Sequence, residues 1–100
     1  GSAFATFAVV PDTAFRAIGG EARGFQVTGD SGKGGTRFFC PDCGSPLWSE
    51  VEVMPGFRFV KAGALDEAAW LVPVSSYWGD SAQPWAQPAQ GIPVHPQNPT

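Results

Sequence analysis

The stretch Phe39-Cys40-Pro41-Asp42-Cys43-Gly44 contains both cysteines of the chain, and it sets the expected structure of the residues around it. Two thiols three positions apart, with a glycine just beyond them, are typical of a zinc-knuckle turn. In such a turn backbone amides point back at the sulfurs while both sulfurs face one ion. Runs rich in Phe, Val and Trp lie on either side, at residues 36–39 and 47–53. We therefore expect the turn to join two strands.

The cysteine pair supplies only half of a structural zinc site, because such a site takes four ligands and one Cys-x-x-Cys motif gives two. We predict Cys40 and Cys43 as metal ligands, with zinc as the ion. His95 is the one remaining conventional nitrogen donor, and its place in a proline-rich tail makes it a poor candidate for a third ligand. Three other interpretations stay open: a redox-active motif, a disulfide that closes a very small loop, and two inert thiols.

The pattern of the rest of the chain predicts an all-β domain, since short runs rich in Val, Phe, Thr and Trp recur between Gly and Pro residues. One short helix is expected at Asp66–Trp70, where Asp66 can cap it and Pro73 prevents it from continuing far. Strands are expected at Ala3–Val10, Phe15–Ile18, Gly24–Thr28, Thr36–Phe39, Leu47–Val53, Phe57–Ala62 and Val72–Tyr77.

Two segments between expected strands are predicted to be hairpin loops. Met54-Pro55-Gly56 lies between alternating runs. Gly29–Gly35 resembles a phosphate-binding loop only in its glycine content, because a strand-like run follows it where a helix would be required. Residues 81–100 carry five prolines and no charged residue, so we expect them to wrap against the body in extended form, with a low-complexity linker as the alternative.

Length, charge and composition narrow the class of protein. The chain has 100 residues and a net charge of -3; 15% of its residues are charged and 43% hydrophobic, which favours one packed domain and excludes a coiled coil. Its basic residues are scattered from Arg16 to Lys61, so neither nucleic acid nor a membrane is an expected partner. The longest apolar run, Ala3–Val10, is too short to span a bilayer. Because the only methionine is Met54, we expect residues 1–100 to be a single, N-terminally truncated domain.

Several elements taken together resemble one known family. They are Gly1-Ser2-Ala3-Phe4-Ala5, Val9-Val10-Pro11 with Phe15, Phe39–Gly44, Gly63-Ala64-Leu65-Asp66, and the segment from Trp78 to Trp85. This combination resembles the glutathione-dependent formaldehyde-activating enzymes, which share a family with centromere protein V. The resemblance covers almost the whole chain.

The resemblance implies a fold and a chemistry. The fold would be antiparallel sheets in a β-tent (Mss4-like) arrangement with a zinc-knuckle turn, and the activity would be that of a carbon–sulfur lyase on a small thiol adduct of the glutathione and formaldehyde type. A structural zinc would be held by an early Cys-x-Cys pair together with Cys40 and Cys43. A catalytic zinc would use a Cys-x-Cys-x-x-Cys cluster that comes immediately before the segment matching Gly1–Ala5, and it would act as a Lewis acid on a substrate oxygen.

The catalytic zinc ligands are therefore absent from this chain, and no catalytic residue is assigned. The alternative function is a non-catalytic zinc-binding β module whose metal site is shared between two chains, which makes a homodimer the expected assembly. A small thiol adduct is the expected partner under the first function. Two cysteines arranged for a metal, without a disulfide framework, suit the reducing cytoplasm.

Other residues receive less specific roles. Asp42 and Asp80 are expected to cap turns, and the four tryptophans are expected to anchor the core and the tail. Arg37 and Lys61 could bind a substrate carboxylate, although lone exposed bases on strands usually have no specific partner.

Overall fold

The computed structural model describes residues 2–98, which fall into two compact units. One unit is Phe7–Ala68, and the other combines the residues up to Thr6 with those from Ala69 onward. The expectation of one domain over residues 1–100 stays a prediction. Within residues 2–98, no helix is long and apolar enough to cross a membrane.

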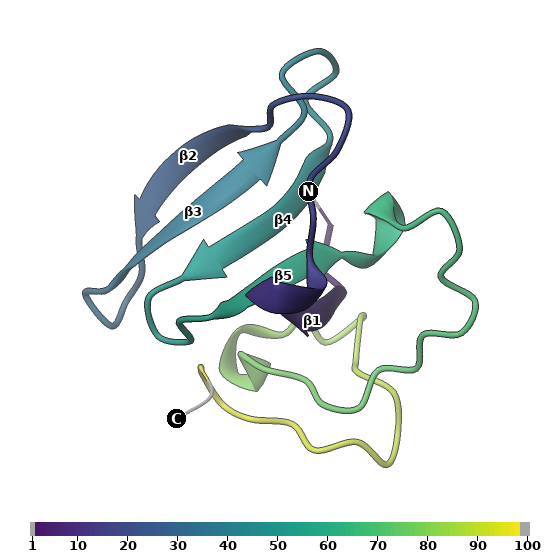
Figure 1. Ribbon diagram of the computed structural model, residues 1–100. Coiled ribbons are helices and arrows are strands. Elements are labelled where there is room, and N and C mark those ends of the chain that lie inside the picture. The colour runs from purple at the N-terminus through teal and green to yellow at the C-terminus, as the bar shows by residue number, and fades with distance from the viewer. Residues whose placement is uncertain (1, 99–100) are drawn as a thin grey trace. The chain divides into compact units, whose positions relative to one another are not determined.

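The first unit is built on a five-stranded antiparallel sheet (Figure 1). Its strands lie in the order β1-β5-β4-β3-β2. The helical elements of the described chain are the single 3-10 turns η1 (Asp12–Ala14), η2 (Ala62–Ala64) and η3 (Gly79–Ser81). The all-β class is confirmed, whereas the several sheets of a tent stay a prediction. The strands are β1 (Phe7–Pro11), β2 (Arg23–Thr28), β3 (Gly34–Phe39), β4 (Pro46–Val51) and β5 (Phe57–Lys61).

Both predicted hairpin loops are confirmed. Antiparallel β2 and β3 are joined through residues 29–33, where the Gly29 N–H donates to the Lys33 carbonyl at 2.9 Å. Antiparallel β4 and β5 are joined through Met54-Pro55-Gly56, and Gly56 has a φ of 86°, a left-handed conformation that glycine adopts without strain. These local connections place β2 beside β3 and β4 beside β5.

The register between strands gives the sheet two chemically different faces. Residues directly opposite one another, such as Phe25, Arg37 and Ser49, share a face, and side chains alternate along each strand. We call the face that carries Trp48 the Trp48 face; it also carries Gln26, Thr36, Phe38, Glu50 and Arg58. We call the opposite one the basic face; it carries Phe7, Val9, Arg23, Phe25, Arg37, Phe39, Leu47, Ser49, Phe59 and Lys61.

The core lies on the Trp48 face. Trp48 is 8% exposed and is the one buried hydrophobic side chain among the described residues. Its ring stacks on Phe38, with centroids 4.6 Å and planes 11° apart, and Phe15 packs against it at 4.9 Å. The Arg58 guanidinium lies 4.4 Å from the Phe15 ring centroid and 5.5 Å from that of Trp48, which adds cation–π attraction to the stack.

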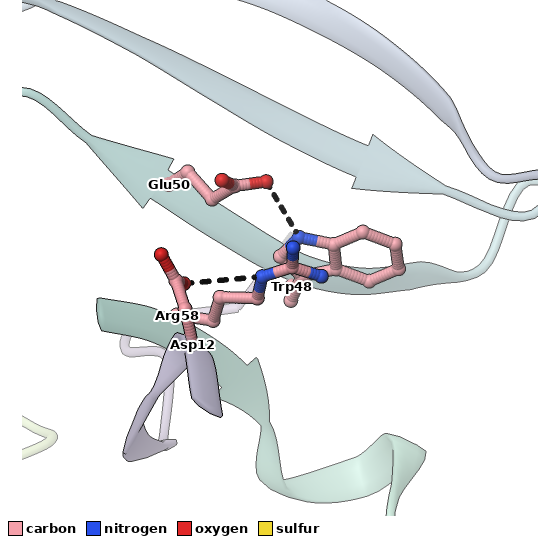
Figure 2. Close-up of polar contacts among 4 residues, drawn as sticks. All are labelled: Asp12, Trp48, Glu50 and Arg58. Carbon is pink, nitrogen blue, oxygen red and sulfur yellow. Dashed lines mark hydrogen bonds and ion pairs between the residues drawn. The ribbon is translucent and has the colours of Figure 1, made fainter. Parts of the chain in front are cut away.

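Two carboxylates complete this cluster (Figure 2). The Trp48 Nε1–H donates to Glu50 Oε2 at 3.1 Å, so the buried indole keeps a hydrogen-bond partner. The Arg58 Nε lies 3.3 Å from Asp12 Oδ1, an ion pair that ties β5 to η1 at a separation of 46 residues. The tryptophan predicted as a core anchor is therefore held by both stacking and hydrogen bonding.

Three sequence predictions of local structure are wrong. Residues 15–18 form no strand, because Phe15 packs onto Trp48 instead of continuing a ladder. The helix expected at Asp66–Trp70 is absent, and the only helical turn nearby is η2, which ends before it. Val72–Tyr77 forms a single bridge at Ser76 rather than a strand. In addition, the first strand begins at Phe7 and not at Ala3.

In the second unit, the end of the proline-rich segment pairs with residues 76–80. Ser76 forms a parallel bridge with Val94, and the His95 N–H donates to the Ser76 carbonyl at 2.8 Å. The His95 ring stacks on Tyr77 with centroids 4.8 Å apart, and the Trp78 Nε1–H donates to Asn98 Oδ1 at 2.8 Å. Ordered contacts therefore hold residues 93–98 within this unit, although prolines interrupt them.

Candidate metal site at the Cys40–Ser45 turn

The cysteine pair lies in the tight turn that joins β3 to β4. β3 ends at Phe39, where the pairing with β4 shifts register between Phe38 and Phe39. The turn is closed by two backbone hydrogen bonds: the Cys40 N–H donates to the Ser45 carbonyl at 2.9 Å, and the Gly44 N–H donates to the Cys40 carbonyl at 2.8 Å. The paired strands thus fix both ends of the segment that carries the thiols.

Gly44 has the backbone conformation that reverses the chain after the second cysteine. Its φ is 78°, in the left-handed region where a β-carbon is strained. This explains why a glycine follows the Cys-x-x-Cys motif. The conformation brings Ser45 back beside Cys43, where both its backbone and its side chain can reach the sulfur.

Ser45 is the main influence on the Cys43 thiol. The Cys43 Sγ lies 3.2 Å from the Ser45 Oγ, within hydrogen-bonding distance for sulfur. The pKa of Cys43 is lowered from 9.0, first by the Ser45 hydroxyl, then by the Ser45 backbone N–H and then by the Cys40 thiol. The charge of Asp42 and slight desolvation act in the opposite direction. The turn therefore favours the thiolate, which is the form that binds metal.

The two thiols fit as two ligands of a soft metal ion. Neither forms a disulfide; Cys43 is exposed and Cys40 is half-buried. The Cys40 thiol is one of the groups that lower the pKa of Cys43, so the two thiols of the turn interact. Within residues 2–98, however, no group of three or more His, Cys, Asp or Glu side chains is arranged to hold a metal ion. A four-ligand zinc site would need two donors beyond those that this turn supplies.

The other candidates lie apart from this turn or act on it indirectly. Asp42 is in the turn, where its charge raises the pKa of Cys43, so it opposes the thiolate rather than assisting it. His95 stacks on Tyr77 in the second unit and belongs to no metal-binding group among the described residues. The backbone N–H of Asp80, in η3, donates to the Pro96 carbonyl at 3.3 Å, which is a structural contact.

A hollow of about 550 Å³ lies elsewhere in the sheet unit. Its lining includes Asp12, Glu50 and Glu52 but neither cysteine. All three carboxylates already accept hydrogen bonds or pair with a cation: Arg58 for Asp12, the Trp48 indole for Glu50, and the Gly34 N–H for Glu52 at 2.9 Å. We therefore place the candidate chemistry at the cysteine turn and not in this hollow.

Sequence reasoning missed the role of Ser45. The only signal for it was position, since it is the first residue after the glycine of the motif and the knuckle turn directs backbone amides at the sulfurs. The same position predicts that the Ser45 hydroxyl can also reach a cysteine sulfur.

Comparison with models of known protein families gives a match over most of the chain. The family model described as glutathione-dependent formaldehyde-activating enzyme matches residues 1–81. The matched span contains the whole five-stranded sheet and the cysteine turn. A search of curated proteins gives no significant match.

Proposed function

Because the chain belongs to the glutathione-dependent formaldehyde-activating enzyme family, we propose that it serves carbon–sulfur lyase chemistry on a small thiol adduct, with Cys40 and Cys43 as two ligands of a structural zinc ion. The adduct would be of the type that glutathione forms with formaldehyde. The whole protein would carry out the reaction, and this chain would contribute its sheet and half of the structural metal site.

One observation carries the metal part of this proposal. Cys40 and Cys43 lie in a closed turn. The Ser45 side chain, the Ser45 backbone and the Cys40 side chain each lower the pKa of Cys43 and so favour its thiolate. When bound, zinc would add a cross-link between the ends of β3 and β4, and its binding free energy would become folding free energy.

The described residues support no step of the reaction itself. The sheet unit holds Asp12 and Arg58 in an ion pair beside the buried Trp48, where Arg58 stabilises packing. The lyase step is therefore proposed for the protein as a family member, without a catalytic residue from this chain.

The experiment that tests the metal site compares Cys40→Ser with Asp42→Asn. We expect zinc, measured by mass spectrometry of the purified protein, to be lost from Cys40→Ser, together with a lower melting temperature and no further effect of a chelator. Asp42→Asn should keep the metal, because removing this charge relieves an effect that raises the Cys43 pKa. A Cys40→Ser variant that melts like the wild type, with and without chelator, would contradict a structural zinc.

The lyase part is tested separately. The full-length protein should change the rate at which formaldehyde and glutathione form or release their hydroxymethyl adduct, followed by NMR against the uncatalysed reaction. No change above the uncatalysed rate, in zinc-loaded protein, would contradict the enzymatic function and leave the structural metal site standing.

A second function is favoured by one observation. Among the described residues the turn offers two thiols and no third donor, so two chains could complete one tetrahedral site between them. In that case the protein would be a non-catalytic zinc-binding module that dimerises through its metal.

A further inference from the structure

The basic face of the sheet has an unbalanced charge. Arg23, Arg37 and Lys61 lie on it, which is three of the six basic residues in a chain whose net charge is -3. The strand residues that share this face include no Asp or Glu. The only strand carboxylate, Glu50, lies on the Trp48 face. Half of the Lys and Arg residues of this acidic chain thus lie on a face whose strand residues carry no carboxylate.

Arg37 and Lys61 are the two cations of this face that influence each other. Arg37 is on β3 and Lys61 is on β5, with β4 between them. The Lys61 pKa is lowered, first by its partial burial and then by the charge of Arg37. The Lys61 Nζ lies 4.3 Å from the centroid of the Phe7 ring, which holds the ammonium against the face. Neither cation forms an ion pair with another residue of the 2–98 segment.

Arg58 provides the contrast on the other side of the same sheet. Its guanidinium is paired with Asp12 and lies over two aromatic rings. Lys61 has a cation–π contact with Phe7, but the strand residues of the basic face include no carboxylate equivalent to Asp12. Two like charges held near one another on a partly desolvated surface repel, and a bound anion would relieve that repulsion.

We propose that Arg37 and Lys61 bind a carboxylate group of a small thiol, with the Ser49 hydroxyl as a further donor between them. Ser49 is directly opposite Arg37 in the register and lies on the central strand that separates the two cations. The arginine fork can hold both oxygens of one carboxylate, while the lysine adds a point charge. The identity of the ligand rests on the proposed function, since glutathione carries two carboxylates.

Phenylalanine side chains on the same face could contact the part of the ligand that is not the carboxylate. Phe7 and Phe59 pack edge to face with ring centroids 6.0 Å apart, beside Lys61 on the same face. Phe25, which is 63% exposed, lies directly opposite Arg37 on the edge strand β2. Apolar surface next to a pair of cations fits a small organic acid better than a free inorganic anion.

The test measures glutathione binding by titration calorimetry to the full chain at low ionic strength. Arg37→Gln and Lys61→Gln should each weaken binding about tenfold, the effect of losing one charge-assisted hydrogen bond at a partly exposed site. Lys61→Arg should keep most of the affinity. Lys33→Gln is the matched control: it removes one positive charge from the β2–β3 loop and should leave binding unchanged. Circular dichroism and melting temperature establish that each variant is folded, and Arg37→Gln decides the matter if Lys61→Gln does not fold.

The carboxylate itself is tested with glutathione diethyl ester, which has lost both negative charges. We expect the ester to bind at least tenfold more weakly to the wild type and equally weakly to Arg37→Gln. Equal binding of acid and ester, equal loss in Lys33→Gln, or no binding of glutathione by the folded wild type would each overturn the inference. Zinc content does not depend on these variants. Wild-type protein that accelerates adduct turnover, while Arg37→Gln binds glutathione as tightly as the wild type, would overturn this inference and leave the proposed function standing.

Discussion

The hydroxyl of Ser45 is the largest single influence on the exposed Cys43 thiol, and its removal gives a clear prediction at the residue scale. In Ser45→Ala the Cys43 pKa should rise toward 9.0, so less thiolate is present near neutral pH. We expect Cys43 to be alkylated by iodoacetamide several-fold more slowly at pH 7.5, measured on the Cys43 peptide by mass spectrometry. Ser45→Thr retains the hydroxyl and should react like the wild type.

The pH dependence of the same group has a definite sign. Because the folded-state pKa of Cys43 lies below its ordinary value of 9.0, deprotonation stabilises the metal-free fold above pH 9, and this contribution is lost as the pH falls through the folded-state value. The alkylation rate of the wild type should therefore reach half of its maximum at a lower pH than that of Ser45→Ala. Coincident pH profiles would mean that the 3.2 Å contact between Sγ and Oγ does not influence the thiol.

At the scale of elements, the stability of the sheet depends on the stack beneath Arg58. Trp48→Ala removes the buried ring that contacts Phe15 and Phe38, at a cost of about 3 kcal/mol or more. For a domain of this size that corresponds to a fall of more than about 10 °C in melting temperature. Trp85→Ala is the control, because Trp85 is 75% exposed and its loss should change stability by less than about 0.5 kcal/mol. Equal effects of the two substitutions would place the core elsewhere.

The same elements mark the limit of sequence reasoning. The hairpins around residues 29–33 and 54–56 were predictable, because glycine and proline specify a turn from local backbone geometry alone. The cysteine turn was predictable for the same reason. Phe15 was misassigned to a strand, since its packing on Trp48 depends on residues that are distant in sequence. The placement of Arg37 and Lys61 on one face likewise follows only from the register of β3, β4 and β5, which no local pattern specifies.

At the scale of the whole molecule, the number of metal ligands constrains the assembly. Each chain offers the two thiols of one turn, and the described residues contain no cluster of three donors. Zinc in a structural site takes four ligands. For this 100-residue chain, the simplest complete site is therefore one ion between two cysteine turns, related by a two-fold axis.

This arrangement predicts that zinc content and dimer formation are lost together. Native mass spectrometry of the zinc-loaded 100-residue chain should give a dimer that carries one zinc ion, which is about half an ion per chain. Removal of zinc by a chelator, or the substitution Cys43→Ser, should yield monomers, because the shared ion is then lost from the interface. Lys33→Gln, which leaves the turn unchanged, should remain a zinc-linked dimer. One zinc ion on each monomeric chain would contradict sharing, since it would require the chain to supply donors other than Cys40 and Cys43.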